Sequence, residues 1–359
     1  MTLKAKSDHG RPISRRRFSA AAAAMLLLPQ VARSQEGRTV TDAAGRRVPL
    51  PARVERIYAA GPPASILVFA IAPHKLIGWT TAWREAERPF ISKKYADLPT
   101  LGRLTGRGNT ANVEVVLQAK PDLIIDYGTV SPTLASLADR VQQQTGIPYL
   151  LLDGDFERMG DAIRLIGAAA REEGRADALS RYAQETTSDI NRRVTKVPAA
   201  RRPRVYYGRG PQGLNTGLAG SITTEFIEQL GAVNVAAGLG RGGLVQVSIE
   251  QVLAWNPDVI VTIDSNFHAA ARTHPQWRDL PAVKAGRLYL APTLPFGWID
   301  SPPSINRLIG LRWLARILYP DAFPEDLRPI VRDFYTRCYH QAPTDAQLDQ
   351  LLRQPAPAA

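Results

Sequence analysis

The residues of this sequence best suited to chemistry are arginines and aromatic residues that fall in the same short loops. A guanidinium group is planar and carries five donors, so it pairs with the oxygens of a carboxylate, hydroxamate or catecholate. Aromatic rings offer a flat surface for a planar or greasy chelate, with Tyr hydroxyls and Trp N–H groups as polar handles. These loops predict a site for a small anionic molecule, formed by Trp83, Arg84, Arg103, Arg107, Tyr127, Tyr207, Arg209, Phe267, His268, Phe296 and Trp298.

A structural reading of the same residues stands beside this prediction. Taken singly, each ring fits the interior of a lobe as well as a ligand site, so the prediction rests on the group. Arg103 and Arg107 both precede the helix start at Asn112, the sequence does not choose between them, and one of the two fits a solvated loop charge equally well. The glycine-rich turn around Arg107 also offers backbone N–H groups to an anion, although such a turn is usually only a turn.

Metal coordination and catalysis find less support in the sequence. Of His74, His268, His274 and His340, only His268 falls on one of these loops, and a lone histidine is more often an ordinary surface residue. The single Cys338 excludes an internal disulfide and a multi-cysteine metal site. The chain has no nucleophile elbow, paired catalytic carboxylates or dinucleotide fingerprint. We therefore expect a protein that is not an enzyme, with no resident metal or cofactor.

The elements that must position these loops alternate between helices and short apolar strands. The sharpest example is a helix at Asn112–Ala119, a turn at Pro121-Asp122 and an apolar strand at Leu123–Asp126. This alternation predicts an α/β fold with parallel sheets covered on both faces. Because ligands in such folds sit beyond the carboxyl ends of the strands, the rule selects the loops at Gly61–Ala64, Trp79–Arg84, Tyr127–Thr129, Tyr207–Gly210, Asp264–His268 and Thr293–Asp300.

The second half of the chain repeats part of the first. Shifted by 136 residues, Ser248–Thr262 aligns on Asn112–Asp126 with six identities in fifteen positions, including the Pro-Asp pair. A helix, a Pro-Asp turn and a strand are also a common way to build one βαβ unit. We favour duplication, because the matched units occupy corresponding places on either side of a long helical segment.

That segment, Phe156–Val197, predicts two linking helices between two Rossmann-like lobes. Its first helix carries an apolar face, Gly174 interrupts the pattern, and a second helix follows over Arg175–Lys196. A helix of that length is about 33 Å long, roughly one small domain across. We predict an N-terminal lobe at 38–153 and a C-terminal lobe with closing helices at 203–353. The long helix should touch no ligand and should permit only a small closure.

The N-terminus predicts an export signal. Arg15, Arg16 and Arg17 precede an apolar run at Ala20–Leu28, which is too short to span a bilayer, and small residues follow. The paired arginines resemble the twin-arginine class; a membrane anchor is the alternative. We expect cleavage near residues 32–36 and a periplasmic protein. Residues 1–34 hold seven Lys or Arg and one Asp, so cleavage halves the net charge of +12 to about +6. No basic block suggests a nucleic-acid partner.

These features resemble the periplasmic substrate-binding proteins of ABC importers for ferric siderophores, haem and vitamin B12. The resemblance is carried by Arg56–Ala60, Leu76–Gly78, Leu101–Arg103, Val113–Ile125 and its echo at Pro257-Asp258. Pro295–Arg307 is similar to a subgroup that binds iron or other metal complexes. The resemblance implies two α/β lobes joined by one long helix, a ligand between them, and an inner-membrane ABC permease as partner. We expect a monomer.

The resemblance also implies roles for single residues. Asp300 matches the loop that contacts ligand in the vitamin B12-binding relative, although it could instead cap a helix beginning at Pro302. Docking on the permease uses one surface Glu per lobe, for which Glu85 or Glu87 fits the first lobe. In the second lobe the matching position is Gly220, so Glu225, one turn along a helix predicted at Ser221–Leu230, is the substitute.

Three functional hypotheses follow. The first is a binding protein for a metal chelate, foremost a ferric siderophore, with haem or a corrinoid as a variant of the same idea. The second is a binder of molybdate or tungstate, which the arginines would suit. The third, a periplasmic enzyme, is disfavoured by the absence of a catalytic motif.

Overall fold

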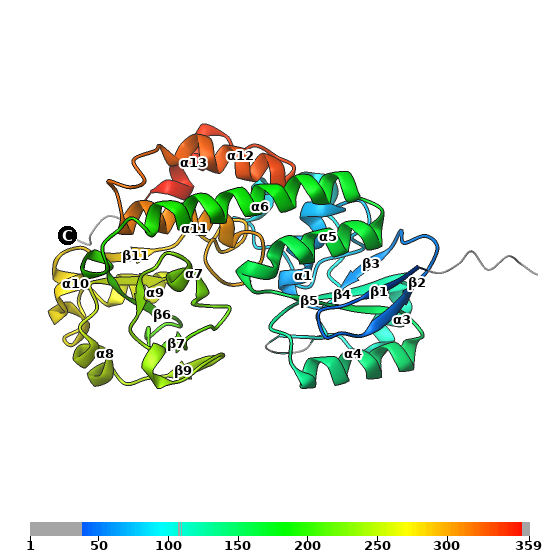
Figure 1. Cartoon of the computed structure of the whole chain (residues 1–359), viewed down its shortest axis with the longest axis horizontal. Coiled ribbons are helices and arrows are strands. Elements are labelled where there is room, and N and C mark those ends of the chain that lie inside the picture. Colours follow the sequence, from blue (N-terminus) through cyan, green and yellow to red (C-terminus); the bar gives the residue numbers. More distant parts are fainter. Residues whose placement is uncertain (1–37, 107, 109, 354–359) are drawn as a thin grey trace, which may run out of the picture. The chain divides into compact units, whose positions relative to one another are not determined.

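The computed structural model describes residues 38–106, 108 and 110–353, and two parallel sheets form its framework (Figure 1). The first sheet has the strand order β3-β4-β5, and all of its pairings are parallel. Its strands are fully or almost fully buried, which explains their unbroken apolar sequences. The strands are β3 (Ile57–Ala59), β4 (Leu123–Gly128) and β5 (Tyr149–Asp153).

Helices cover both faces of this first sheet. Leu123 and Ile125 pack with α1 (Pro62–Ile71) and α5 (Met159–Ala170), whereas Ile124, between them, packs with the other cluster. That second cluster draws on α3 (Val113–Ala119) and α4 (Pro132–Thr145). Successive residues thus face opposite layers, as a strand requires. An antiparallel pair that the sequence did not predict, β1 (Arg38–Thr41) with β2 (Arg47–Leu50), precedes β3.

The second sheet is built in the same way. Its order is β11-β10-β6-β8, again with only parallel pairings. The strands are β6 (Arg204–Gly208), β8 (Val233–Asn234), β10 (Val259–Thr262) and β11 (Leu288–Leu290). A short antiparallel pair, β7 (Asn215–Gly217) with β9 (Leu244–Gln246), lies outside this sheet. The α/β class with parallel sheets is therefore confirmed.

Other helices lie around the second sheet: α7 (Glu225–Gln229), α8 (Ile249–Trp255), α9 (Ser265–Ala270), α10 (Pro281–Lys284) and α11 (Arg307–Leu318). The last two helices are α12 (Leu327–Tyr339), which packs against α1 and α11, and α13 (Asp345–Leu352), which packs against α12. In the connections are α2 (Lys93–Ala96) and the short 3₁₀ turns η1 (Arg88–Phe90), η2 (Phe156–Arg158), η3 (Ala199–Arg201), η4 (Ala237–Leu239) and η5 (Trp277–Asp279). None of the helices in the described ranges is both long and apolar enough to cross a bilayer.

The long helix predicted between the two sheets is present as α6 (Glu173–Val194), with 22 residues. It begins two residues earlier than predicted and includes Gly174. The break falls instead at Arg171, whose backbone is left-handed with φ of 57°. The buried face of α6 includes Leu179, Ala183 and Ile190. One continuous hydrophobic cluster contains this face and strands of both sheets, so the two sheets share a core across α6.

The two units matched by the predicted repeat have the same local structure. In each copy a side-chain oxygen at the helix start, from Asn112 or Ser248, accepts a backbone N–H three residues on. Each helix then ends on a non-glycine residue in the left-handed region, Lys120 with φ of 46° or Asn256 with φ of 44°. The same capping chemistry therefore sets the length of α3 and α8.

The aspartates of the two Pro-Asp turns explain why that motif recurs. The Asp122 carboxylate accepts the backbone N–H groups of Glu55 and Arg56 at 2.8 and 2.9 Å. The Asp258 carboxylate accepts the backbone N–H of Arg204 at 2.8 Å. Each aspartate thereby fixes the chain at or just before the start of the neighbouring parallel strand.

Two predicted helix boundaries are wrong. The helix predicted over Ser221–Leu230 is limited to α7, because the chain before it turns at Gly220, whose φ is 63°. The helix expected to begin at Pro302 begins at Arg307 as α11. In both places the polar or proline-rich lead-in forms a turn, and the apolar periodicity begins only after it.

Candidate ligand-binding site

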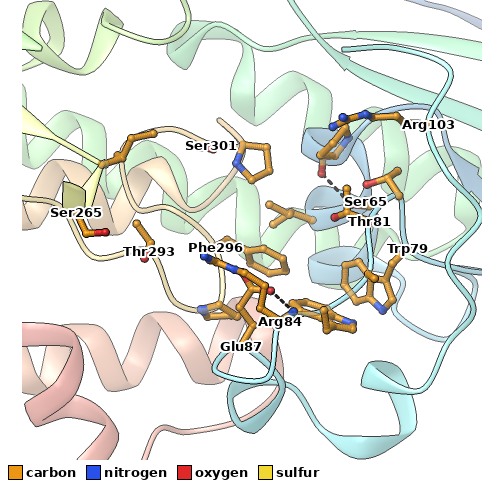
Figure 2. Close-up of a pocket in the computed structure, with 18 of the residues that line it drawn as sticks. Ser65, Trp79, Thr81, Arg84, Glu87, Arg103, Ser265, Thr293, Phe296 and Ser301 are labelled. Carbon is orange, nitrogen blue, oxygen red and sulfur yellow. Dashed lines mark hydrogen bonds and ion pairs between the residues drawn. The ribbon is translucent and has the colours of Figure 1, made fainter. Parts of the chain in front are cut away.

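A cavity of about 530 Å³ lies between loops that follow strands of the two sheets (Figure 2). The first sheet contributes the start of α1, the segment Trp79–Arg84, Glu87 and Arg103. The second sheet contributes Ser265 and residues near Thr293–Pro302. The start of α1, Trp79–Arg84, Ser265 and the residues from Thr293 onward belong to loops that the strand-end rule selected, whereas Glu87 and Arg103 lie outside those loops. The rule did not identify every side chain that faces the cavity.

One wall of the cavity is aromatic. The rings of Trp79 and Trp83 meet edge to face with centroids 4.7 Å apart, and Phe296 lies 5.5 Å from Trp83. Trp79 is fixed by its indole N–H, which donates to the backbone oxygen of Tyr95 at 2.7 Å. The indole N–H of Trp83 is buried and has no hydrogen-bond partner among the described residues. Trp83 therefore brings a flat surface to this wall, while its N–H stays buried and unpaired within the described chain.

Arg84 lies at the cavity beside Glu87 and Phe296, as Figure 2 shows. Its Nε donates to Glu87 Oε1 at 2.6 Å, and its Nη2 lies 2.5 Å from the same oxygen. The other oxygen, Oε2, accepts the backbone N–H of Arg84 at 2.8 Å. The Arg84 side chain is 70% exposed and that of Glu87 only 13%. Glu87, predicted as a docking residue, thus faces the cavity.

Arg103 brings a second guanidinium group to the cavity. Its Nε donates to the backbone oxygen of Gly108 at 2.9 Å, and no carboxylate of the described chain lies within ion-pair distance of it. The loop that carries it is held to the first sheet, because the N–H groups of Leu104 and Thr105 both donate to the carbonyl of Ala60. Arg103 is therefore a positioned cation without a protein counter-ion in the described residues.

A buried carboxylate supports this loop from below. Asp126, at the end of β4, accepts the hydroxyls of Thr105 at 3.0 Å and Tyr149 at 3.2 Å and the backbone N–H of Tyr127. Burial raises the pKa of Asp126, opposed by these three hydrogen bonds. Gly61 must be glycine here, since a Cβ would approach the Thr105 hydroxyl to 2.7 Å. These contacts place the Arg103 loop directly over the start of α1.

The second sheet contributes hydroxyl groups and no charged side chain to the cavity lining. The Ser265, Thr293 and Ser301 side chains face it, and Ser265 begins α9 behind the cap that Asp264 forms. On the opposite side, the Ser65 hydroxyl donates to the carbonyl of Pro62 at 2.8 Å. The described lining thus combines two cations and one carboxylate from the first sheet with neutral hydroxyls from the second.

Arg209 and Asp300, both predicted as ligand contacts, bind each other instead of lining the cavity. Arg209 Nε lies 2.7 Å from Asp300 Oδ2, and the Tyr207 hydroxyl donates to the same oxygen at 2.9 Å. The other carboxylate oxygen accepts the backbone N–H of Ser301 at 2.6 Å. Burial raises the pKa of Asp300, against the attraction of Arg209. Asp300 does not cap a helix at Pro302, because α11 starts only at Arg307.

The structure buries four further predicted residues away from the cavity lining. Tyr127 donates its hydroxyl to the Gly154 carbonyl at 3.3 Å, and Trp298 donates its indole N–H to the Tyr335 hydroxyl at 3.0 Å. Phe267 packs against a tryptophan of η5. The His268 ring contacts the Leu288 carbonyl at 3.3 Å, and burial lowers its pKa. Each of these side chains lies in the protein interior, which was the alternative to a ligand contact that the sequence allowed.

Of the remaining predicted residues, Arg107 lies outside the described part of the chain. Glu85 is exposed, as a docking residue must be. Glu225 forms an ion pair with Arg307 at 3.0 Å and accepts the backbone N–H of Phe156. Arg307 is fully buried, so Glu225 serves the interior. No group of three or more His, Cys, Asp or Glu residues that could hold a metal ion occurs in the described ranges.

Sequence reasoning missed Trp79, the hydroxyl groups and the inward orientation of Glu87. Trp79 does stand at the first position of a selected loop, so position after a strand was the available signal. The hydroxyls carried no signal, because Ser and Thr are common in any loop. The orientation of Glu87 depends on a tight local turn, since its N–H donates to the carbonyl of Arg84 at 3.0 Å.

Comparison with known proteins gives consistent matches. A family model described as "Periplasmic binding protein" matches residues 85–294, more than half of the chain. The chain is 28% identical to the molybdate-binding protein MolA of Haemophilus influenzae, over 84% of this chain and 91% of that protein. It is 27% identical to the vitamin B12-binding protein of Vibrio cholerae, over 58% of this chain and 74% of that protein.

A solved structure agrees with these sequence matches. The ABC transporter solute binding protein of Sulfurospirillum deleyianum is 30% identical and superposes with a TM-score of 0.80. The match covers 88% of this chain and 99% of that one.

Proposed function

Since the chain belongs to the periplasmic binding protein family, whose members here are substrate-binding proteins of ABC transporters and not enzymes, we propose that its cavity binds an anionic metal chelate. The first candidate is a ferric siderophore. The observation that carries this proposal is the combination of a cavity of about 530 Å³, an aromatic wall and two arginines. Sites for small organic ligands have volumes of roughly 300–1,000 Å³ and are lined mainly by apolar groups with a few placed polar ones.

The chemistry of the lining matches that of a chelate. The outer surface of a ferric siderophore is partly aromatic or aliphatic, and its charge is carried by oxygens around the metal. Trp79, Trp83 and Phe296 supply apolar contact, and Arg103 supplies a cation that no described carboxylate neutralises. Charge-assisted hydrogen bonds from arginine to such oxygens are among the stronger polar contacts in proteins. The metal would then be bound through its chelator and not by protein ligands.

A molybdate or tungstate oxyanion is the second candidate. It is favoured by the match to a molybdate-binding protein along most of both chains. Arginines and hydroxyls together are suitable donors for four oxyanion oxygens. The size of the cavity favours the chelate, because a single tetrahedral anion would leave most of the volume to water. Haem or a corrinoid is a third ligand to test, supported by the match to a vitamin B12-binding protein and by the flat aromatic wall.

The partner of an ABC transporter binding protein is a membrane permease, and we propose Glu85 as a docking residue because it is exposed. We further propose that binding closes the cavity only slightly. The shared core across α6 supports this, since wide opening would expose buried apolar surface of both sheets. The lobe boundaries at 38–153 and 203–353 and the monomeric state also stay predictions.

Export to the periplasm by a twin-arginine signal is likewise proposed. The predicted signal at residues 1–34 lies outside the described residues. N-terminal sequencing of the mature protein from its own host tests it, with a new terminus near residues 32–36 as the expected result. Retention of the full N-terminus in the membrane fraction would support an anchor instead.

The ligand can be identified from protein purified from the periplasm of its own host. Native mass spectrometry and elemental analysis should find iron together with an organic chelator. Molybdenum or tungsten without an organic molecule would favour the second candidate. Trp83 lies at the cavity, so tryptophan fluorescence should report titrations with ferric chelates, molybdate, tungstate, haem and cobalamin. The proposal of a chelate is contradicted if only the oxyanions bind.

A further inference from the structure

The pairing of Arg84 with Glu87 occupies one of the two cations of the cavity. Both side chains line the cavity, and within the described part of the chain the Glu87 carboxylate accepts hydrogen bonds only from Arg84. One carboxylate oxygen takes the Nε and Nη2 groups of the guanidinium at 2.6 and 2.5 Å, and the other takes the backbone N–H at 2.8 Å. The edge of Arg84 that faces Glu87 is one that a ligand carboxylate or catecholate would use.

The two partners differ in their freedom to move. Glu87 is mostly buried and is held by two contacts with the backbone of Arg84. The N–H of Glu87 donates to the carbonyl of Arg84, and Oε2 of Glu87 accepts the N–H of Arg84. The Arg84 side chain is 70% exposed, so water can solvate its guanidinium once it leaves Glu87. An ion pair with one solvent-exposed partner is weakened, because solvent screens the charges and ordering a long side chain costs entropy. Arg84 can therefore exchange partners while Glu87 stays in place.

We propose that Glu87 is an internal counter-anion of Arg84 which an anionic ligand displaces, so that Glu87 determines which ligand charges the cavity accepts. This inference rests on the proposed function and refines it. A strongly anionic ligand replaces the Glu87 carboxylate on the guanidinium and also contacts Arg103. An uncharged ligand cannot make that exchange and gains nothing from Arg84. Glu87 thereby lowers the affinity for all anions and leaves a net preference for those able to contact both arginines.

A purely structural role for this pair predicts something different. If Arg84 and Glu87 only held the turn, removing the Glu87 charge would loosen the loop and weaken binding of every ligand. If Glu87 acted only through long-range repulsion, any nearby carboxylate would have the same effect, with or without Arg84. A double-mutant cycle separates the three cases, because it measures whether the effect of one residue requires the other.

The test uses the mature protein with Glu87→Gln, Arg84→Ala, the double variant, and Glu114→Gln as an exposed control of equal charge change outside the cavity. Gln keeps an oxygen for the backbone N–H of Arg84. The probes are molybdate, ferric enterobactin as an anionic tris(catecholate) and ferrichrome as an uncharged tris(hydroxamate), titrated by tryptophan fluorescence. Anionic probes should bind Glu87→Gln roughly two- to fivefold more tightly, the factor equivalent to an exposed ion pair. Ferrichrome affinity should not change.

In the Arg84→Ala background the same Glu87→Gln change should leave the affinity for the anionic probes unchanged. Glu114→Gln should leave it unchanged both in the parent protein and in Arg84→Ala. The inference is overturned if Glu87→Gln weakens or leaves unchanged the binding of the anions, or if the gain persists without Arg84. Weaker binding of all probes with a lower melting temperature would assign the pair to the turn. If no probe binds the unmodified protein, the proposed ligand class fails and this inference fails with it. Binding by the unmodified protein with no gain in Glu87→Gln refutes the inference alone.

Discussion

The Thr105 hydroxyl donates to the buried Asp126 carboxylate at 3.0 Å and so joins the loop that carries Arg103 to the end of β4. Asp126 is almost fully buried and has no cationic partner in the described chain, only the hydroxyls of Thr105 and Tyr149 and one backbone N–H. The position of Arg103, a cation at the cavity, therefore depends on the Asp126 carboxylate, which does not line the cavity.

This arrangement makes stability depend on pH at Asp126. Burial raises the pKa of Asp126 above its ordinary value of 3.8, so the folded state holds the proton more tightly than the unfolded state does. Its contribution to stability is full below the ordinary pKa and is lost as pH rises through the raised folded pKa. Asp126→Asn keeps an acceptor for Thr105 and removes the titration. The free energy of unfolding of the variant should fall less between about pH 4 and pH 7 than that of the parent, measured by urea denaturation. An equal fall would show that Asp126 titrates normally.

Replacing Arg103 or Arg84 with alanine should mainly reduce the affinity for the ligand. Loss of a hydrogen bond to a charged group costs about 1.5–3 kcal/mol, or roughly a ten- to hundredfold weaker affinity. We expect that loss for Arg103→Ala with an anionic chelate, measured by isothermal titration calorimetry. Arg84→Ala should lose less, because its guanidinium is partly neutralised by Glu87 before the ligand arrives. If both variants bind every anionic candidate as the parent does, the site is assigned wrongly.

Arg209→Ala should instead destabilise the fold. It leaves the Asp300 carboxylate, only 1% exposed, without its cation, and breaking a buried pair costs roughly 3–5 kcal/mol. Asp300→Asn combined with Arg209→Ala should recover part of this loss, since no buried charge is then left unpaired. Chemical denaturation measures both variants. A loss in Arg209→Ala below about 1 kcal/mol, the range of exposed pairs, would indicate that Arg209 is free to serve the ligand.

Alanine variants of Glu225 and Glu85 should have different effects, the first on stability and the second on docking to the permease. Glu225→Ala removes the carboxylate 3.0 Å from the fully buried Arg307, and we expect a loss of roughly 3–5 kcal/mol in unfolding free energy. Glu85→Ala should leave the unfolding free energy within about 0.5 kcal/mol, as for most exposed substitutions. It should reduce stimulation of permease ATPase activity in reconstituted vesicles while ligand affinity is kept. Full stimulation by Glu85→Ala would exclude Glu85 from the docking surface.

Trp83→Phe tests the aromatic wall. Phe keeps the ring that meets Trp79 edge to face and removes the buried, unpartnered indole N–H. If a ligand oxygen accepts from that N–H, affinity should fall by roughly tenfold, as for loss of about 1.5 kcal/mol. The fluorescence change on binding should also shrink, so calorimetry supplies the affinity. Unchanged affinity would show that the ligand uses only the apolar surface of this wall.

The sequence predicted the sheets well because their signals are local. The apolar run at Leu123–Asp126 and the Pro-Asp turn before it are sufficient to place β4, and the repeat places β10 by comparison. Gly174 was misread, because one exposed glycine in a 22-residue helix costs only about 1 kcal/mol relative to alanine and the remaining turns outweigh it.

The cavity lining was harder to predict than the fold. The rule that ligands sit beyond strand ends selected the loops, but it says nothing about which way a side chain turns. Tyr207 follows Val205 by two positions and so shares its buried face, a signal present in the sequence. The ion pair of Arg209 with Asp300 joins residues 91 positions apart, and no local pattern predicts it. Contacts between residues distant in the sequence therefore decided which of the predicted side chains are buried in the core and which line the cavity.

The shared core beneath the two walls of the cavity predicts a site that is formed before its ligand arrives. The cluster that passes from the first sheet through α6 to the second includes Trp79 and Phe296 of the aromatic wall, and Trp83 packs against it. Binding to such a preformed site requires little ordering of the protein, so little affinity is lost to it. Association rates of different ligands should then be similar, and discrimination should lie in how long each one stays. For a carrier that must release its cargo, residence time is the quantity that selection can adjust.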